Sequence, residues 1–135
     1  MKISRFENLD CWQEARTLSK MVYAATHGAM FKKDLRLSGQ LQAASASIMA
    51  NIAEGFIRHS DREFIQFLFI AMSSAAEVQS HLYIALDQGY IEQGSFDELY
   101  EQANRTAMLI SGLIKYLRFP QTNPAKQTKQ TLLTK

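Results

Sequence analysis

Apolar residues recur along the chain at steps of three and four, the spacing of residues on one face of an α-helix. The pattern predicts helices at about 8–26, 33–57 and 60–88, and a fourth from residue 95 to just before Pro120. No segment alternates apolar and polar residues as a half-buried strand does. Because the breaks between the helices are short, we expect an all-α, antiparallel up-down-up-down four-helix bundle.

Capping residues predict where these helices begin and end. Two capping boxes, in which Ser is followed three residues later by Glu, occur at Ser60–Glu63 and Ser95–Glu98. The first helix has Asn8 or Asp10 as its expected N-terminal cap, and Gly89 is the expected end of the third helix.

The third predicted helix is unusually apolar in its first half. Residues 64–76 carry no charged side chain, yet this stretch is shorter than the roughly 20 residues that a bilayer requires, so no membrane partner is expected. Apolar residues lie on nearly every side of this half, and such a helix must be covered all round. We therefore expect a subunit interface there, with Phe67, Phe69 and Ile70 as candidate contact residues.

A row of small side chains lies beside the apolar stripe of the second helix, formed by Ala43, Ala46, Ala50 and Ala53. Small side chains let a neighbouring helix approach closely. The expected place of this row is therefore a tight contact in the core.

Composition limits the class of protein. The 135 residues suffice for one domain with a single core, and 47% apolar with 21% charged residues is a globular balance. Two prolines and six glycines are too few for the many turns of an all-β sandwich, and the one cysteine excludes an internal disulfide framework. The first residues contain no apolar signal region, so the expected location is the cytoplasm.

The positive charge of the chain is concentrated at its C-terminal end. Residues 1–119 hold 12 Lys and Arg against 13 Asp and Glu, a net charge of −1. Residues 120–135 hold three lysines, Lys126 and Lys129 among them, and no acid. We expect residues 1–119 to form the bundle and 120–135 to be a flexible basic tail, with Pro120 and Pro124 ending regular structure.

The residues for common enzyme chemistry do not come together in the sequence. The Glu-x-x-His motif of di-iron bundles does not occur, and the glycines match no phosphate-binding loop. Glu77 and His81, four residues apart, fit either a weak metal pair or an ordinary helix-surface pair. Cys11 lies on an apolar stripe, where an inert buried thiol is more common than a nucleophile. We expect no enzyme activity, no metal and no cofactor.

A polar row within the second helix is the most informative chemical feature. Ser47, Asn51 and Glu54 share one face with Arg58, and Ser74 and Glu77 of the third helix carry groups that match them. One interpretation is a buried or pore-facing polar site. The favoured interpretation is a hydrogen-bonded network that fixes helix register or an oligomer interface. A buried Glu54 would then require a partner such as Arg58.

Basic residues cluster at both ends of the second helix. Candidate nucleic-acid contacts are Lys32, Lys33, Arg36, Arg58 and Arg62, together with Lys126 and Lys129 of the tail. The alternative is ordinary solvated charge, since Asp34, Asp61 and Glu63 dilute both clusters.

Linked motifs give a resemblance to a known family. The run SASIMANIAEG at 45–55 resembles the S-x-P-A-N-I-A-E-G signature of the four-helix-bundle family encoded in intervening sequences of bacterial 23S rRNA genes. FENLDCWQEA at 6–15, LRLSGQLQAA at 35–44 and REFIQFLFIAMSSAAEVQSHL at 62–82 resemble its other helices, so the likeness covers about residues 5–118. This chain departs from the family pattern at 42–43, 49 and 72–73, and two of these changes remove positive charge.

The resemblance implies a four-helix bundle that assembles into a ring-like homopentamer. It also implies kinship with the accessory variability protein of diversity-generating retroelements, a basic pentamer that binds nucleic acid and reverse transcriptase. No enzyme activity is implied for the intervening-sequence branch.

Two hypotheses of function follow. The first is a non-enzymatic homo-oligomer, a pentamer, that binds RNA or a nucleoprotein partner, with steep salt dependence as its required signature. The second is a protein-interaction scaffold with no nucleic-acid role, which the net charge of −1 over residues 1–119 favours. An enzyme or small-molecule pocket near Asn51 and Glu54 is less well supported than either, because no nucleophile–base pair or metal-ligand set converges there.

Overall fold

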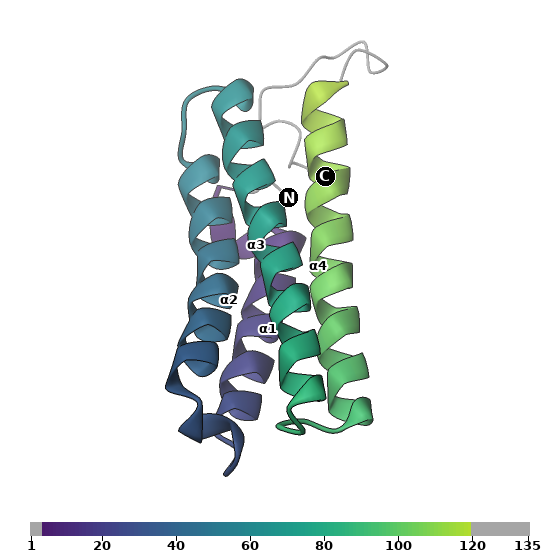
Figure 1. Cartoon of the computed structure of the whole chain (residues 1–135). Helices are drawn as coiled ribbons and strands as arrows, with labels where there is room; N and C mark the ends of the chain where they lie inside the picture. The colour runs from purple at the N-terminus through teal and green to yellow at the C-terminus, as the bar shows by residue number, and fades with distance from the viewer. Residues whose placement is uncertain (1–3, 120–135) are drawn as a thin grey trace.

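The computed structural model describes residues 4–119, which form an all-helical bundle. The four long helices are α1 (Asp10–Thr26), α2 (Leu35–Phe56), α3 (Asp61–Asp87) and α4 (Gln93–Arg118). Two short 3-10 turns, η1 (Phe6–Asn8) and η2 (Phe31–Lys33), precede α1 and α2, and this part of the chain contains no strand. Consecutive helices run in opposite directions (Figure 1), which confirms the antiparallel up-down-up-down prediction. The tail predicted at 120–135 lies outside the described residues.

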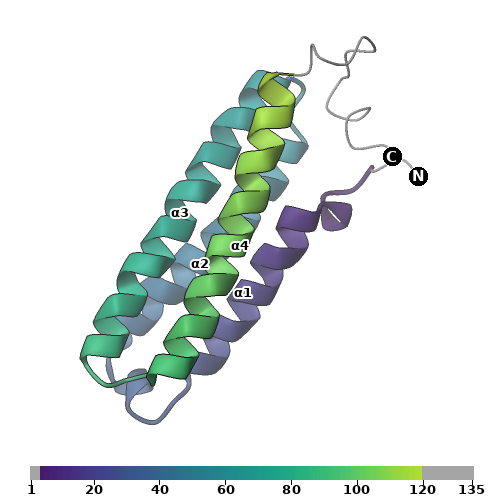
Figure 2. The same cartoon turned by 90° about the vertical axis from the view of Figure 1, so that its right-hand side faces the viewer.

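Each helix packs against two main neighbours around the bundle. α1 packs against α2 and α4, and α3 packs against the same two helices from the other side (Figures 1 and 2). α1 has 17 residues and the other three have 22 to 27, so α1 covers only part of the length of its neighbours (Figure 2). The η1 turn continues this cover, because Phe6 packs edge-on against Trp12 with 5.2 Å between ring centroids.

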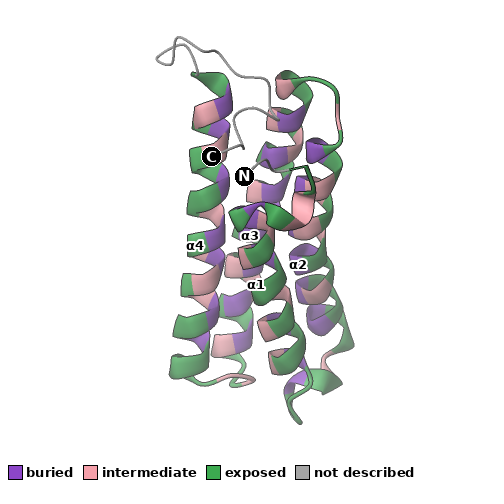
Figure 3. Cartoon of the chain, turned by 180° about the vertical axis from the view of Figure 1, so that it is seen from behind, coloured by how far each residue is buried: buried purple, intermediate pink, exposed green. Residues whose placement is uncertain are grey.

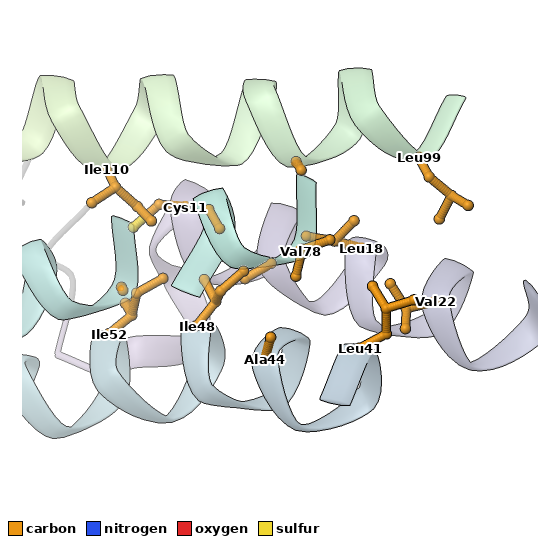
Figure 4. Close-up of a cluster of buried hydrophobic side chains, with 14 of the residues drawn as sticks. Cys11, Leu18, Val22, Leu41, Ala44, Ile48, Ile52, Val78, Leu99 and Ile110 are labelled. Carbon is orange, nitrogen blue, oxygen red and sulfur yellow. The ribbon is translucent and has the colours of Figure 1, made fainter. Parts of the chain in front are cut away.

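The core consists of the predicted apolar stripes. Leu18 and Val22 of α1, Leu41, Ala44, Ile48 and Ile52 of α2, Val78 of α3 and Leu99 and Ile110 of α4 lie close together in the interior (Figure 4). Seen from the α1 side, buried residues line the inward sides of the helices and exposed residues the outward sides (Figure 3). Periodicity alone therefore identified which side of each helix is inward.

Two of the predicted helix ends are confirmed. The Ser60 side chain caps α3, because its hydroxyl accepts a hydrogen bond from the backbone N–H of Glu63 at 3.2 Å. Gly89 follows α3 with a φ of +75°, a left-handed conformation that glycine adopts without steric cost.

A third cap, Asp34, also joins two turns of the bundle. Its Oδ1 accepts from the Leu37 N–H at 3.0 Å, and its Oδ2 accepts from the Tyr90 hydroxyl at 3.0 Å. This second hydrogen bond raises the pKa of Tyr90 and fixes the turn after α3 against the turn before α2.

Two predicted starts are wrong. The capping box at Ser95–Glu98 lies inside α4, which begins at Gln93 because the Phe96 N–H already donates to the Glu92 carbonyl at 2.9 Å. α1 is capped by neither Asn8 nor Asp10. Leu9 occupies the cap position, and its side chain is buried. Burial of an apolar residue next to the helix start decided the boundary here over side-chain capping chemistry.

A close helix contact joins the end of α2 to the start of α3 at Gly55. A Cβ atom on Gly55 would lie 2.8 Å from both the Phe64 Cδ1 and Phe67 Cβ atoms and 3.2 Å from the Phe64 carbonyl oxygen. Side-chain carbons do not approach this closely, so only glycine permits the observed spacing.

The row of alanines beside the α2 stripe does not make this contact, and its predicted place in the core is wrong. Ala43, Ala46 and Ala50 are exposed, and Ala53 is only partly buried. The close approach to α3 uses Gly55 on a neighbouring side of α2, so the alanine row faces outward.

We predict that Gly55→Ala lowers the free energy of unfolding by up to about 2 kcal/mol. Overpacking costs about 1–3 kcal/mol, and the better helix propensity of alanine offsets about 1 kcal/mol of this. The matched control is Gly112→Ala in α4, where nothing lies within 4 Å of the added Cβ and a gain of about 0.5–1 kcal/mol is expected. Urea unfolding midpoints measure both effects, and an increase in stability for Gly55→Ala would contradict the close contact.

Candidate interaction surfaces

The polar row of α2 contributes a small hydrogen-bonded cluster between α2 and α3. The Asn51 Nδ2 donates to the Ser47 carbonyl at 2.9 Å and to the Ser47 hydroxyl at 3.0 Å. The Ser74 hydroxyl of α3 lies 3.0 Å from the Ser47 hydroxyl. The structure thus brings Ser47, Asn51 and Ser74 together and ties one level of α2 to one level of α3.

Glu54 lies outside this cluster and is not buried. Its side chain is 49% exposed and forms a 2.7 Å ion pair with Arg58, the partner expected for it. The Arg58 guanidinium also lies 4.0 Å from Glu63 and 4.7 Å from the Phe67 ring centroid. These residues form a surface clamp across the α2–α3 turn, and the positive charge of Arg58 is already compensated.

Glu77 also stays apart from the Ser47 cluster. Its side chain is exposed, and its carboxylate lies 3.5 Å from the His81 Nε2, so the pair behaves as a helix-surface contact. The His81 Nδ1 is buried and has no hydrogen-bond partner among residues 4–119. Within the same range, no group of three His, Cys, Asp or Glu residues is arranged to hold a metal ion.

Cys11 is an inert core residue in this fold. The side chain is buried among the apolar residues of the core, and this burial raises the pKa of its thiol to about 12. A thiol of this pKa is almost entirely protonated at neutral pH, so it is a poor nucleophile.

The predicted basic clusters lie at opposite ends of α2. Lys32 and Lys33 belong to η2 and Arg36 to the first turn of α2, whereas Arg58 and Arg62 follow its last turn. The 22 residues of α2 span about 33 Å, so the two groups form separate surfaces. Lys126 and Lys129 lie outside the described residues.

The candidate interface residues of α3 point in different directions. Phe67 is half-buried beneath Arg58 on the side of α2, while Phe69 lies under the Arg118 guanidinium of α4, 5.4 Å from its ring centroid. Ile70, 47% exposed, faces outward between them. Successive residues are about 100° apart around a helix, so the three do not share one flat patch.

The outward side of α2 is a surface that the predicted site residues missed. Residues 37–53 contain no charged side chain, and the exposed members include Ala43, Ala46 and Ala50. We call these three alanines, together with the exposed Ile70 and Ile84 of α3, the uncharged α2–α3 face. Its uncharged part is α2, because the exposed Glu77 lies two turns from each isoleucine on the same side of α3. The sequence feature that could have revealed this surface is the uncharged run itself. The row of small residues within it predicted a core position instead.

A second missed surface is an open hollow between α3 and the C-terminal end of α4. Its lining residues are Phe69, Met72, Ser111, Ile114, Lys115, Arg118 and Phe119. We call it the α4-end hollow. The sequence feature that could have revealed this hollow is the distribution of charge, because no Asp or Glu follows Glu101 in this chain.

The fold and these surfaces define an all-helical, antiparallel four-helix-bundle protein. The sequence matches the family described as 23S rRNA-intervening sequence protein over residues 7–112, and the chain belongs to this family. No helix within residues 4–119 combines the length and apolar character needed to span a membrane.

A solved structure shares the fold. It is a protein with unknown function from the S23 ribosomal protein family of Bacteroides thetaiotaomicron, similar with a TM-score of 0.72 and 23% identity. The similarity covers 78% of this chain and 98% of that chain. A comparison with curated proteins found no match.

We predict that the Cys11 thiol is alkylated by iodoacetamide at pH 8 only when the bundle opens. With a pKa of about 12, roughly 10⁻⁴ of the thiol is ionised at this pH, and burial blocks the reagent. Mass spectrometry should show slow labelling of the native protein and rapid labelling in denaturant. Equally fast labelling under both conditions would mean that Cys11 is accessible and reactive.

Proposed function

We propose that this protein is a non-enzymatic homo-oligomer, a pentamer, that works in the cytoplasm and binds RNA or a nucleoprotein partner. The observation that carries the proposal is the uncharged α2–α3 face. The outward sides of α1 and α4 carry ordinary solvated charges such as Arg16, Lys20, Glu98 and Arg105, whereas this face carries none over residues 37–53 of α2.

Self-association is supported by the low desolvation cost of burying such a face. Alanine and isoleucine side chains give up no hydration of charge, and interface centres are depleted of charged residues. The small side chains of Ala43, Ala46 and Ala50 allow the backbone of another subunit to approach closely. Ile70 and Ile84, 47% and 44% exposed, add apolar area on the neighbouring helix.

The pentameric number follows from the family resemblance along residues 5–118. A heterologous contact that repeats around a rotation axis closes into a ring. The Ser47–Asn51–Ser74 cluster, which holds α2 and α3 in one register beside the alanine row, would keep this face in a constant shape.

Binding to RNA is supported by local cations and by the kinship with the retroelement accessory protein that the sequence resemblance implies. Lys32, Lys33 and Arg36 are grouped at one end of the bundle, and Lys126 and Lys129 follow the other. A ring would present each group several times, and multivalency raises weak affinities strongly. The scaffold without a nucleic-acid role remains the second candidate, because residues 1–119 carry a net charge of −1.

We predict that light scattering at micromolar concentration gives a mass near five times 15.3 kDa, and that Ala46→Arg reduces it to that of the monomer. An arginine at this exposed site leaves the bundle intact but places a charge and a large side chain on the contact. Ala24→Arg, at an exposed alanine on the charged side of α1, is the matched control and should keep the wild-type mass. A monomeric wild-type protein would refute the oligomer.

We predict that a fluorescently labelled structured RNA binds the protein at low salt and that its affinity falls steeply as salt rises. Each released phosphate counterion adds to the slope of log affinity against log salt concentration. Replacing Lys126 and Lys129 by alanine in the full chain should lower both affinity and slope in an anisotropy titration. Absence of binding at low salt would leave the protein-interaction scaffold as the function.

A further inference from the structure

The α4-end hollow combines exposed aromatic rings with cations. Phe69 is 43% exposed and Phe119 is 49% exposed, and Met72 and Ile114 line the space with them. Lys115 and Arg118 belong to the same lining, at the end of α4 where the chain continues into residues 120–135 (Figure 1). The hollow therefore offers apolar ring faces and positive charge within one surface.

Among the described residues, no acid pairs with either cation of the hollow. Neither Lys115 nor Arg118 forms an ion pair with any residue in 4–119, and Arg118 is held by cation–π contact with Phe69. Arg62 lies on the same side of α3 as Phe69, two turns earlier. The acids nearest to Arg62 in sequence are its neighbours Asp61 and Glu63, and the Glu63 carboxylate is directed towards Arg58.

We propose that the α4-end hollow binds single-stranded nucleic acid, with bases stacked on Phe69 and Phe119 and phosphates on Lys115 and Arg118. Every base has a flat face that stacks on an aromatic ring, and the strand's phosphates supply the charge that these cations lack. This inference rests on the nucleic-acid part of the proposed function and names its site. It also assigns Phe69 to ligand binding rather than to the subunit interface.

Charge argues against two occupants that this chain could itself supply. Residues 120–135 carry three lysines and no acid, so they would be repelled by Lys115 and Arg118. The same hollow on a second copy has the same charge and is excluded for the same reason. Duplex nucleic acid keeps its bases stacked inside the helix, where the rings of Phe69 and Phe119 cannot reach their faces.

The test is an anisotropy titration of the full chain with labelled 12-nucleotide oligouridine, oligothymidine and an RNA duplex of equal length. Both single strands should bind more tightly than the duplex, and the RNA and DNA arms show which source is preferred. Phe119→Ala and Phe69→Ala should each weaken single-strand binding at least about fivefold. Met108→Ala, which shortens an exposed apolar residue elsewhere on α4, should have no effect.

The charge contribution has its own matched pair. Lys115→Ala with Arg118→Ala should lower the slope of log affinity against log salt by about 1 to 1.5. The control is Lys32→Ala with Lys33→Ala, which removes the same charge before the start of α2, away from the hollow. It should change the slope of log affinity against log salt less. Mass and melting temperature of each variant confirm that assembly and fold are intact.

Three results would overturn the site. Equal loss from the two double variants, with no effect of Phe69→Ala or Phe119→Ala, would show that binding is diffuse attraction and leave the proposed function standing. Tighter binding of the duplex would refute the stacking geometry. No binding of any probe at low salt would refute the site and the nucleic-acid part of the proposed function together, while the mass measurement still decides the oligomer.

Discussion

The close approach of α2 and α3 at Gly55 is the constraint on which the rest of the bundle depends. With no side chain at this position, the first turns of α3 lie against the last turns of α2, and Phe64 is fully buried beneath them. The same spacing brings Ser74 within 3.0 Å of Ser47 and Phe67 beneath the Arg58 guanidinium. Because Gly55 closes the segment 45–55 that resembles the family signature, that signature has a physical basis in helix spacing rather than in chemistry.

The same constraint decides which side of α2 remains uncovered. Once Gly55 and the core stripe of Leu41, Ile48 and Ile52 fix the rotation of α2, the alanine row must point outward. The two surfaces of this molecule then lie on different parts of the bundle, one along α2 and Ile70, the other between Phe69 and the end of α4. A contact made on the first surface does not by itself cover the lining of the second.

The sequence predicted the helices, their inward stripes and the cap at Ser60, because these features depend on residues close together in the chain. It failed where packing between distant segments decided the outcome. Ser95 is as good a capping residue as Ser60, but Glu92 already receives the first backbone hydrogen bond of α4. The alanine row and Gly55 are equally small, and only their rotation relative to α3 separates a core contact from an exposed face. Likewise Glu54 shares a periodicity with Ser47 on α2, and Glu77 with Ser74 on α3, yet both carboxylates remain at the surface with partners of their own.

The net charge of residues 1–119 says little about what a local surface can bind, and α4 shows the reason. This helix has Asp97, Glu98 and Glu101 near its start and Lys115 and Arg118 in its last turn, an order that complements its own dipole. Summed over the bundle these charges nearly cancel, but they lie at opposite ends of a helix about 39 Å long, several times the screening distance at physiological salt. A ligand at one end therefore responds to the cations beside it and not to the acids at the other end. A nearly neutral bundle can in this way present a basic, aromatic surface locally, and the absence of bulk basicity is no argument against nucleic-acid binding at that surface.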